Sequence, residues 1–220
     1  MGKEKLKRYE EVVAFEHVVD LSHLRPGDTA AMRGKWREEV FGNSAPLTVE
    51  LGCGKGDYSL ALARQFPERN FAGIDIKGDR LWKAARQAEQ EQPENLRLVR
   101  GRVDHITQMF GPAELEELWI TFPDPHLKYR RRSRRMTAPN FLERYRNVLA
   151  PGGRIHLKTD SQELFDFTLE TLEQEKAEIR QRIDDVYALD EPPELLRIQT
   201  YYERQHLAKG RTIKYLRFTL

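Results

Sequence analysis

The 220-residue sequence has little of several features that each mark a class of protein. Its single cysteine, Cys53, cannot form an intrachain disulfide, which is typical of proteins from a reducing cytoplasm. No apolar run approaches the length of a membrane span, and the six histidines show no metal-ligand spacing. Internal repeats and low-complexity tracts are also missing. These absences predict a cytoplasmic protein with no membrane partner and no metal.

The overall charge is also small, since the net value is +2 although 33% of the residues are charged. Any function that depends on positive charge must therefore reside in one part of the chain. One segment, 128–135, holds six basic residues and no acid: Lys128, Arg130, Arg131, Arg132, Arg134 and Arg135. Such a run is typical of a phosphate-binding surface, and Tyr129 within it can stack on a base or ribose. A membrane surface is the rival anionic partner, but no apolar face accompanies the charges.

Periodicity and turn residues predict strands that alternate with helices. The expected strands are 47–51, 70–76, 96–100, 117–122 and 154–158, with strand-like runs near 179–187 and 212–219. The expected helices are 57–66, 78–92, 138–149 with Thr137 as its cap, and 161–176. This alternation indicates a doubly wound α/β fold with a parallel sheet, whose ligands bind beyond the carboxyl ends of the strands.

The first part of the chain lacks this regular pattern. Residues 1–45 form a polar, basic stretch with one or two short helical patches. We set the domain boundary after residue 33, so that 1–33 is a basic arm and 34–220 is a single domain. Two interpretations of the arm stay open, contact with RNA and disorder.

A glycine-rich turn, VELGCGKG at 49–56, follows the first regular strand. A dinucleotide fingerprint requires glycine at position 57, where Asp57 stands, and a phosphate-binding P-loop requires Ser or Thr after Lys55. The acid Glu50 before the glycines argues against a pyrophosphate and favours a ligand that is cationic or rich in donors. S-adenosylmethionine is such a ligand, and glycines such as Gly52 and Gly54 let the backbone approach it closely.

Acidic residues also follow the next two predicted strands. Asp75 ends GIDI, where an acid accepts hydrogen bonds from ribose hydroxyls in dinucleotide folds. After the third strand, Arg102 and Asp104 are both candidates for contacts with adenine. Taken singly, Glu50 can be an ordinary strand-end acid and the other two can be solvated loop charges. The spacing of the whole set favours a nucleoside cofactor.

The fourth predicted strand leads into FPDP, in which Pro123 and Pro125 flank Asp124. Each proline fixes φ and removes a backbone donor, so the acid is held in place at low entropic cost. Alone, this motif indicates a rigid turn with an exposed acid. Followed directly by the basic segment, it suggests a methyl donor beside a phosphate-binding loop, and hence methylation of a nucleic acid.

These stretches resemble the bacterial tRNA (guanine-N7)-methyltransferases, which modify guanine 46 in the variable loop of tRNA. Residues 34–56, 71–82, 121–160 and 200–203 carry the resemblance. FPDP followed by basic residues is specific to this family, whereas the glycine motif is shared by methyltransferases generally. The resemblance implies the Rossmann-like class I methyltransferase fold, with a mostly parallel, seven-stranded sheet.

The resemblance also implies roles for individual residues. Glu50 and Asp75 match acids that bind S-adenosylmethionine, and Asp124 matches the proposed catalytic acid, which also lies near the cofactor. The positions matched to substrate binding are Lys128, Asp160, Thr200 and Glu203, to which we add Arg130 and Arg131 from the basic segment. Tyr201 and Tyr202 lie within the last of these motifs but receive no role.

The sequence departs from the family pattern at two positions. Arg102 stands where the family has Asp or Asn, so an adenine contact there passes through the backbone or moves to Asp104. His126 stands where the family has Trp, which puts an aromatic packing role in doubt but not the role of the acid.

Three rival functions explain the motifs less well. A methyltransferase for small molecules or proteins leaves the arginine run unexplained. A non-catalytic RNA-binding protein has no need of Glu50, Asp75 and Asp124, and an NAD enzyme lacks its glycine at 57. We therefore expect a tRNA methyltransferase with S-adenosylmethionine as cofactor, tRNA as partner and no obligate protein partner.

Overall fold

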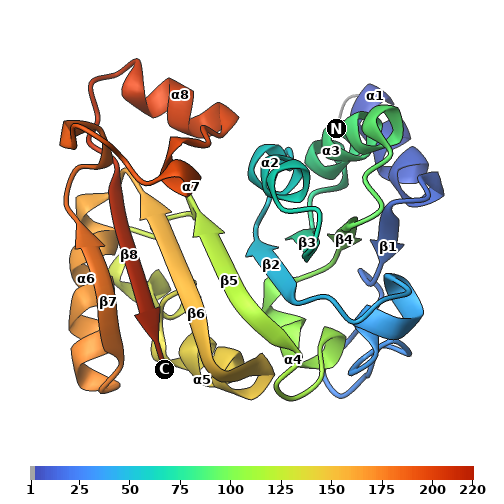
Figure 1. Cartoon of the computed structure of the whole chain (residues 1–220), viewed down its shortest axis with the longest axis horizontal. Helices are drawn as coiled ribbons and strands as arrows, with labels where there is room; N and C mark the ends of the chain where they lie inside the picture. Colours follow the sequence, from blue (N-terminus) through green and yellow to red (C-terminus); the bar gives the residue numbers. More distant parts are fainter. Residues whose placement is uncertain (1–2) are drawn as a thin grey trace.

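One sheet of eight strands organises residues 3–220, the part of the chain that the computed structural model describes (Figure 1). The strand order is β1-β4-β3-β2-β5-β6-β8-β7. Neighbours from β1 to β6 pair in parallel, while β8 is antiparallel to both β6 and β7. The strands are β1 (Val18–Asp20), β2 (Leu47–Leu51), β3 (Asn70–Asp75), β4 (Leu96–Arg100), β5 (Leu115–Thr121), β6 (Leu149–Thr159), β7 (Glu178–Ile183) and β8 (Lys214–Thr219). The predicted α/β, mostly parallel fold is confirmed.

Helices cover both faces of the sheet because its strands are apolar on both sides. In β5, Leu118 and Ile120 point into one buried cluster while Trp119 points into the other. The first cluster includes residues from α4 (Ile106–Met109), α5 (Pro139–Val148) and α6 (Gln162–Gln174). The second includes residues from α2 (Asp57–Gln65), α3 (Gly78–Glu91) and the short α7 (Glu194–Arg197).

The sheet has eight strands, not the seven that the resemblance implied, because β1 comes from the expected basic arm. Helix α1 (Lys3–Glu11) packs on α3, where Trp82 Nε1 donates to Glu11 Oε2 at 3.0 Å. The chain then reaches the open edge of β4, and β1 pairs with it. The part of the arm that the structure describes thus covers one edge of the sheet; the first two residues of the arm lie outside the described residues.

The predicted cap of the helix after the basic segment is wrong. Ala138 is the N-cap of α5 and Pro139 is its first residue, which suits a position whose N–H would lack a partner anyway. Thr137 is instead buried, with its hydroxyl 2.8 Å from that of Thr168 on α6. The next helix, α6, does begin with a side-chain cap, because the Ser161 hydroxyl accepts from the Leu164 N–H.

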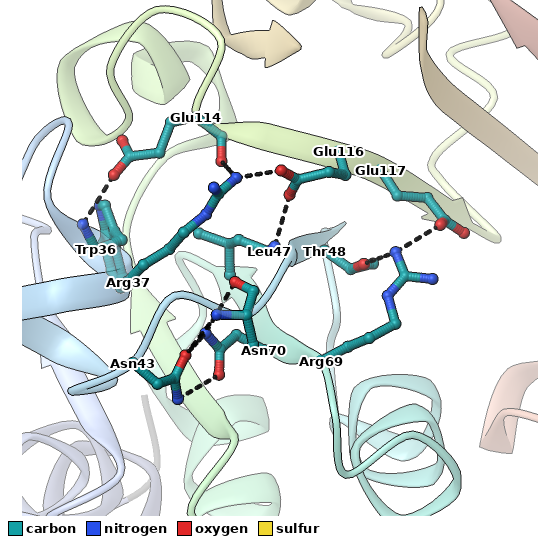
Figure 2. Close-up of polar contacts among 11 residues, drawn as sticks. Trp36, Arg37, Asn43, Leu47, Thr48, Arg69, Asn70, Glu114, Glu116 and Glu117 are labelled. Atoms are coloured by element: carbon teal, nitrogen blue, oxygen red, sulfur yellow. Dashed lines mark hydrogen bonds and ion pairs between the residues drawn. The ribbon is translucent and has the colours of Figure 1, made fainter.

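The amino ends of the central strands are closed by a polar network (Figure 2). Glu114 accepts from the Trp36 N–H at 2.8 Å, and Arg37 pairs with Glu116. Glu116 also accepts from the Leu47 N–H at 2.6 Å. These contacts tie the segment at Trp36 and Arg37 to the starts of β2 and β5, at the end of the sheet where no predicted site residue lies.

The opposite, carboxyl end of the sheet contains a topological switch point. The chain passes from β2 to β3 on one side of β2 and later returns to β5 on the other side. Loops that follow β2 and β5 therefore diverge and leave a crevice between them, which is where open α/β sheets bind ligands.

Candidate active site

A cleft of about 650 Å³ opens at this switch point. It is lined by residues that follow β2, β3, β4 and β5, together with residues from the basic segment and α5. They are Gly52, Asp75, Ile76, Lys77, Arg80, Gly101, Arg102, Val103, Asp104, Phe122, Pro123, Asp124, His126, Arg134, Met136 and Phe141. The volume falls in the range of small-molecule and cofactor sites.

The glycine turn forms the floor of the cleft. Gly52 has a φ of +75°, and a side chain there would place its Cβ 3.2 Å from Met136 Cε, inside the cleft. Gly56 has a φ of +72°, and its Cβ would approach Ala84 Cβ to 2.6 Å, so this turn also lets α2 and α3 pack closely. Of the two glycines predicted to bind the cofactor, Gly52 lines the cleft, whereas Gly54, with a φ of +58°, lines a smaller hollow beside it.

Asp75 lines the cleft at the end of β3. Its carboxylate accepts from the Gly54 N–H at 2.9 Å and from the Lys77 N–H at 2.7 Å. These two bonds fix the carboxylate between the glycine turn and the start of α3. Its remaining acceptor capacity faces the cleft, where a ligand hydroxyl can donate to it.

Glu50 lies behind the cleft and does not line it. Its side chain is only 2% exposed and accepts from the Ser59 N–H at 3.0 Å, from the Ser59 hydroxyl and from the Thr121 hydroxyl at 2.6 Å. Burial raises the pKa of Glu50 to about 7. In this structure the acid therefore ties β2 to α2 and β5, and it supports the glycine turn from behind.

Arg102 and Asp104 lie together on the wall that follows β4. Arg102 Nη2 donates to Asp104 Oδ2 at 2.9 Å, and both residues line the cleft. The two alternatives for an adenine contact are thus combined in one ion pair, in which the carboxylate keeps free acceptor positions.

The FPDP loop presents Asp124 at the mouth of the cleft. Its carboxylate is 72% exposed, accepts from the His126 N–H at 3.0 Å and lies 3.6 Å from His126 Nδ1. Phe122 and His126 both have left-handed backbone conformations, with φ values of +49° and +44°. A backbone held in this way on both sides of Asp124 makes the loop a rigid mount for an exposed carboxylate.

Arg135 is the residue that holds this mount in place, which corrects its assignment to the phosphate-binding run. Its side chain is fully buried, and its Nε donates to the Pro125 carbonyl at 2.9 Å. Its Nη2 lies 2.7 Å from Glu163 Oε1 and donates at 3.4 Å to the His126 carbonyl. Because the side chain is buried and its Nε and Nη2 donate within the protein, this guanidinium is unavailable to a phosphate in solvent.

The five other cations of the run reach solvent along the short helical segment Tyr129–Arg134 and its flank. Within residues 3–220 no carboxylate forms an ion pair with any of them: Lys128, Arg130, Arg131, Arg132 and Arg134. Tyr129 is 80% exposed, with the Arg132 guanidinium 4.8 Å from its ring centroid. Unpaired cations beside an exposed ring suit a nucleic acid strand.

Asp160 lies on the far side of the FPDP loop, in a second hollow of about 510 Å³ that Pro125 and Leu127 also line. Its carboxylate is 3.1 Å from His206 Nδ1 and also pairs with Arg211. The FPDP loop therefore lies between the two hollows, with Pro123 and Asp124 lining the cleft and Pro125 lining the hollow that contains Asp160.

Thr200 and Glu203 are buried and do not line the cleft. The Thr200 hydroxyl accepts from the Glu203 N–H at 3.1 Å, which forms a capping box at the start of α8 (Tyr201–Leu207). Glu203 is paired with the fully buried Lys158 at 2.7 Å and accepts from the Tyr187 hydroxyl at 2.8 Å. Both residues fix the position of α8 above the end of β6.

Sequence reasoning missed several residues of the cleft. Arg80 follows Asp75 by five positions, so the first turn of α3 brings it to the same wall, and Lys77 lies between them. Met136 and Phe141 come from the segment after the arginines, where the sequence shows only an ordinary amphipathic helix. The strand-to-helix geometry after Asp75 is the one signal that would have indicated Arg80.

The comparisons with known proteins agree with this arrangement. The profile of a family described as putative methyltransferases matches residues 44–216. The chain is 44% identical over its full length to a tRNA (guanine-N(7)-)-methyltransferase from Christiangramia forsetii, of which it covers 99%, and 39% identical over its full length to one from Bacteroides thetaiotaomicron, of which it covers 87%. The chain belongs to the tRNA (guanine-N7)-methyltransferase family.

Solved structures support the fold of this family member. The 16S rRNA methyltransferase KamB superposes with a TM-score of 0.64 at 15% identity, over 83% of this chain and 91% of that one. A 16S rRNA (adenine(1408)-N(1))-methyltransferase from Catenulisporales acidiphilia, solved with its cosubstrate SAM, has a TM-score of 0.54 at 15% identity and covers 82% of this chain and 88% of that one. The methyltransferase therefore has the Rossmann-like fold predicted for it.

Two further surveys concern the described residues. No helix among them is both long and apolar enough to cross a membrane. No group of three or more His, Cys, Asp and Glu side chains within residues 3–220 is arranged to hold a metal ion.

Proposed function

We propose that this methyltransferase transfers a methyl group from S-adenosylmethionine to N7 of guanine 46 in the variable loop of tRNA. One observation carries the proposal: an exposed, rigidly mounted carboxylate stands between a nucleoside-sized cleft and a segment of unpaired cations. The curated relatives that match the chain over its full length share the name of this activity.

The residues of the cleft fit S-adenosylmethionine. The glycine turn admits the ligand where a Cβ would meet Met136, and Asp75 offers an acceptor to the ribose hydroxyls. Arg102 and Asp104 line the wall at which adenine would lie. When bound, the cofactor supplies an electrophilic methyl group on a sulfonium. Glu50 contributes to binding from behind, through its bonds to Ser59 and Thr121.

The chemistry requires positioning more than proton transfer. Guanine N7 carries a lone pair in the plane of the ring, so no base has to deprotonate it before attack. A bond forms between N7 and the methyl carbon while the carbon–sulfur bond breaks, and the positive charge moves from sulfur to the purine. Asp124 stabilises this developing charge and orients the base by accepting from a guanine amine.

The substrate lies against the basic segment. Lys128, Arg130 and Arg131 are exposed and unpaired, and they bind tRNA phosphates without reading sequence. Asp160 contributes to the hollow beyond the FPDP loop. Thr200 and Glu203 act indirectly, because they fix α8 and do not reach the cleft.

We also assign the methyltransferase domain to residues 34–220 and treat 1–33 as an appended arm that covers the β4 edge of the sheet. A cytoplasmic location follows from the proposed substrate, since tRNA is modified there, and the protein acts without an obligate protein partner.

The experiment that tests the proposal uses purified protein, a tRNA transcript and S-adenosylmethionine with a labelled methyl group. After digestion to nucleosides, the label is expected in 7-methylguanosine. A matched transcript with adenine at position 46 should stay unlabelled. Label in another nucleoside would overturn the N7 assignment, and label in the control transcript would overturn the position.

A further inference from the structure

A second group of unpaired cations lies on the other wall of the cleft, and we propose that it binds the same tRNA. This α8 patch consists of Lys55, Arg80, Lys83, Tyr201 and Arg204. The inference rests on the proposed function and deepens it, because it adds a second contact surface for the substrate. Three separate elements supply the patch: the glycine turn, α3 and α8.

The cations of the patch lie close enough to affect one another. The pKa of Lys55 is lowered, first by burial and then by the positive charges of Lys83, Arg204 and Arg80, although Asp57 opposes this effect. Four cations on one small surface repel each other, which is unfavourable unless an anion joins them. Asp57 is one carboxylate against four cations, and its oxygen accepts from the Tyr201 N–H at 2.8 Å, so it offsets the group only in part.

The cations also lack carboxylate partners. Among residues 3–220, no carboxylate forms an ion pair with Lys55, Arg80, Lys83 or Arg204, whereas Arg64, Arg69 and Arg100 are each paired with an acid. Lys83 and Arg204 are exposed, so their charges are available to a partner in solution.

Aromatic rings lie within the patch. Lys55 Nζ is 3.0 Å from the ring centroid of Tyr201, and the Arg80 guanidinium is 5.6 Å from that of Tyr202. The two tyrosines meet edge to face at 5.4 Å, and Tyr201 keeps 38% of its surface exposed. Cations interleaved with exposed rings suit a nucleic acid strand, because phosphates pair with the cations while bases or sugars stack.

The position of the patch explains why the ligand would be the same tRNA. Arg80 lines the cleft from the α3 side, and Arg134 of the basic segment lines it from the opposite loop. A smaller hollow with Lys55, Thr200 and Tyr202 continues from the cleft and shares Gly52, Arg80 and Phe122 with it. The basic segment follows β5, Lys55 follows β2, and Arg80 and Lys83 lie in α3 after β3, so both groups lie beyond the carboxyl ends of parallel strands. A strand that brings a guanine into the cleft would thus meet cations on both sides.

The test uses the double variant Lys83→Gln/Arg204→Gln, since neither residue lines the cleft or forms an ion pair among the described residues. Binding of unmodified tRNA transcript is measured at several salt concentrations. We expect the slope of log K against log salt to become shallower by about 1.5 to 2, and the affinity to fall roughly tenfold at moderate salt. The affinity for S-adenosylmethionine should change less than twofold.

The matched control is Lys176→Gln/Arg180→Gln, which removes the same charge near the other end of the sheet, from Lys176 in the turn after α6 and from Arg180 in β7, where it pairs with Glu178. It should leave the salt slope unchanged. A third variant, Tyr201→Leu, should weaken tRNA binding several-fold without a change in slope, because stacking releases no counterions.

Two outcomes would overturn the proposal. An unchanged affinity and salt slope in Lys83→Gln/Arg204→Gln would show that tRNA does not touch the patch. Weaker binding of S-adenosylmethionine with unchanged tRNA binding would make the patch part of the cofactor site. Either result is compatible with 7-methylguanosine formation by the wild type, so failure of this inference is distinguishable from failure of the proposed function.

Discussion

The charged side chains at the two ends of the sheet differ in whether they have ion-pair partners. At the amino end, Glu116 and Glu117 are satisfied by Arg37, Arg69 and Arg154, as Figure 2 shows in part. At the carboxyl end, the five exposed cations of the basic segment and the four of the α8 patch have no ion-pair partner within residues 3–220. The acids at the amino end are neutralised from within the chain, whereas these particular cations at the carboxyl end are left for a ligand to neutralise.

We therefore expect the residues that stabilise the fold and the residues that bind substrate to lie at opposite ends of the sheet. A paired, buried network fixes the strands to one another, and its removal should cost folding free energy. Unpaired surface cations contribute little to folding and even oppose it, so their presence is better explained by binding. Substitutions at the two ends should therefore give different phenotypes.

Asp124→Ala should give the largest effect on function. Loss of the carboxylate removes stabilisation of the developing purine charge, so we expect turnover to fall by about 10² to 10³-fold. The affinity for tRNA should stay within about twofold, because Asp124 is an acid among cations and binds no phosphate. Single-turnover methylation and tRNA binding measure the two quantities.

The control is Asp184→Ala, an exposed acid paired with Arg182 near β7 and away from the cleft. It should leave both quantities unchanged. If Asp124→Ala instead lost tRNA affinity with normal turnover at saturation, Asp124 would be a substrate clamp.

Glu117→Gln should give the largest effect on stability. Burial alone would raise the pKa of Glu117, but His156, Arg69 and Arg154 hold that pKa well below its usual range. Replacement leaves these partners uncompensated, so we expect the free energy of unfolding to fall by about 3 kcal/mol. This value is at the low end of the cost of breaking a buried ion pair, because both arginines reach solvent. Urea denaturation at pH 7 measures it, with turnover of the folded variant unchanged.

The comparison for this variant is Glu91→Gln, which breaks the exposed pair with Arg64. Its cost should stay below about 1 kcal/mol. Equal costs for the two variants would mean that the amino-end network contributes no more than a surface ion pair.

Glu50→Gln should change the pH dependence of stability. Glu50 keeps its proton up to about pH 7 in the folded protein, whereas the unfolded chain releases it near pH 4.5. Between these values the unfolded state binds fewer protons, so wild-type stability falls as pH rises. Between pH 4.5 and pH 8 the variant should gain on the order of 3 kcal/mol relative to wild type.

Urea denaturation without cofactor at both pH values measures this difference. The relevant quantity is the difference in stability between the two pH values. Loss of the acceptor for Ser59 and Thr121 lowers the stability of the variant by the same amount at both, so it does not affect this difference. Parallel curves for the two proteins would show that Glu50 is ionised at neutral pH, with an ordinary pKa.

Arg130→Gln/Arg131→Gln should give the smallest effect, and one that depends on salt. We expect the slope of log K against log salt for tRNA to become shallower by about 2, with folding and cofactor affinity unchanged. Fluorescence titration at several salt concentrations measures the slope. A slope equal to that of wild type would assign phosphate contact to other residues of the segment.

The sequence was sufficient to predict the central layers of the fold. Strands such as 47–51 and 96–100 are short apolar runs between turn residues, and the structure confirms them as β2 and β4. The strand β1 could not be predicted, because three residues at a sheet edge acquire their conformation from pairing with β4 and not from local propensity. For the same reason the cap of α5 was misplaced: the Thr137 hydroxyl is occupied by a tertiary contact.

The cleft residues that could be predicted from the sequence are those at or just after the end of a strand. Asp75 ends β3, while Asp104 and Asp124 lie in the loops after β4 and β5, and all three line the cleft, as expected from the switch-point rule. Burial was the quantity that sequence could not supply. Glu203 was matched to substrate binding but is fully buried against Lys158, and Arg135 could not be told apart from its exposed neighbours.

The clamp formed by Arg135 has a consequence for how this molecule can change. It fastens the FPDP loop to α6 through Glu163, so that residues 127–134 leave and re-enter the body of the protein at a closed base. The exposed stretch 127–134 can therefore change in sequence without moving the residues at its base. Its length and its pattern of cations can change during evolution, while the Asp124 carboxylate keeps its position at the mouth of the cleft.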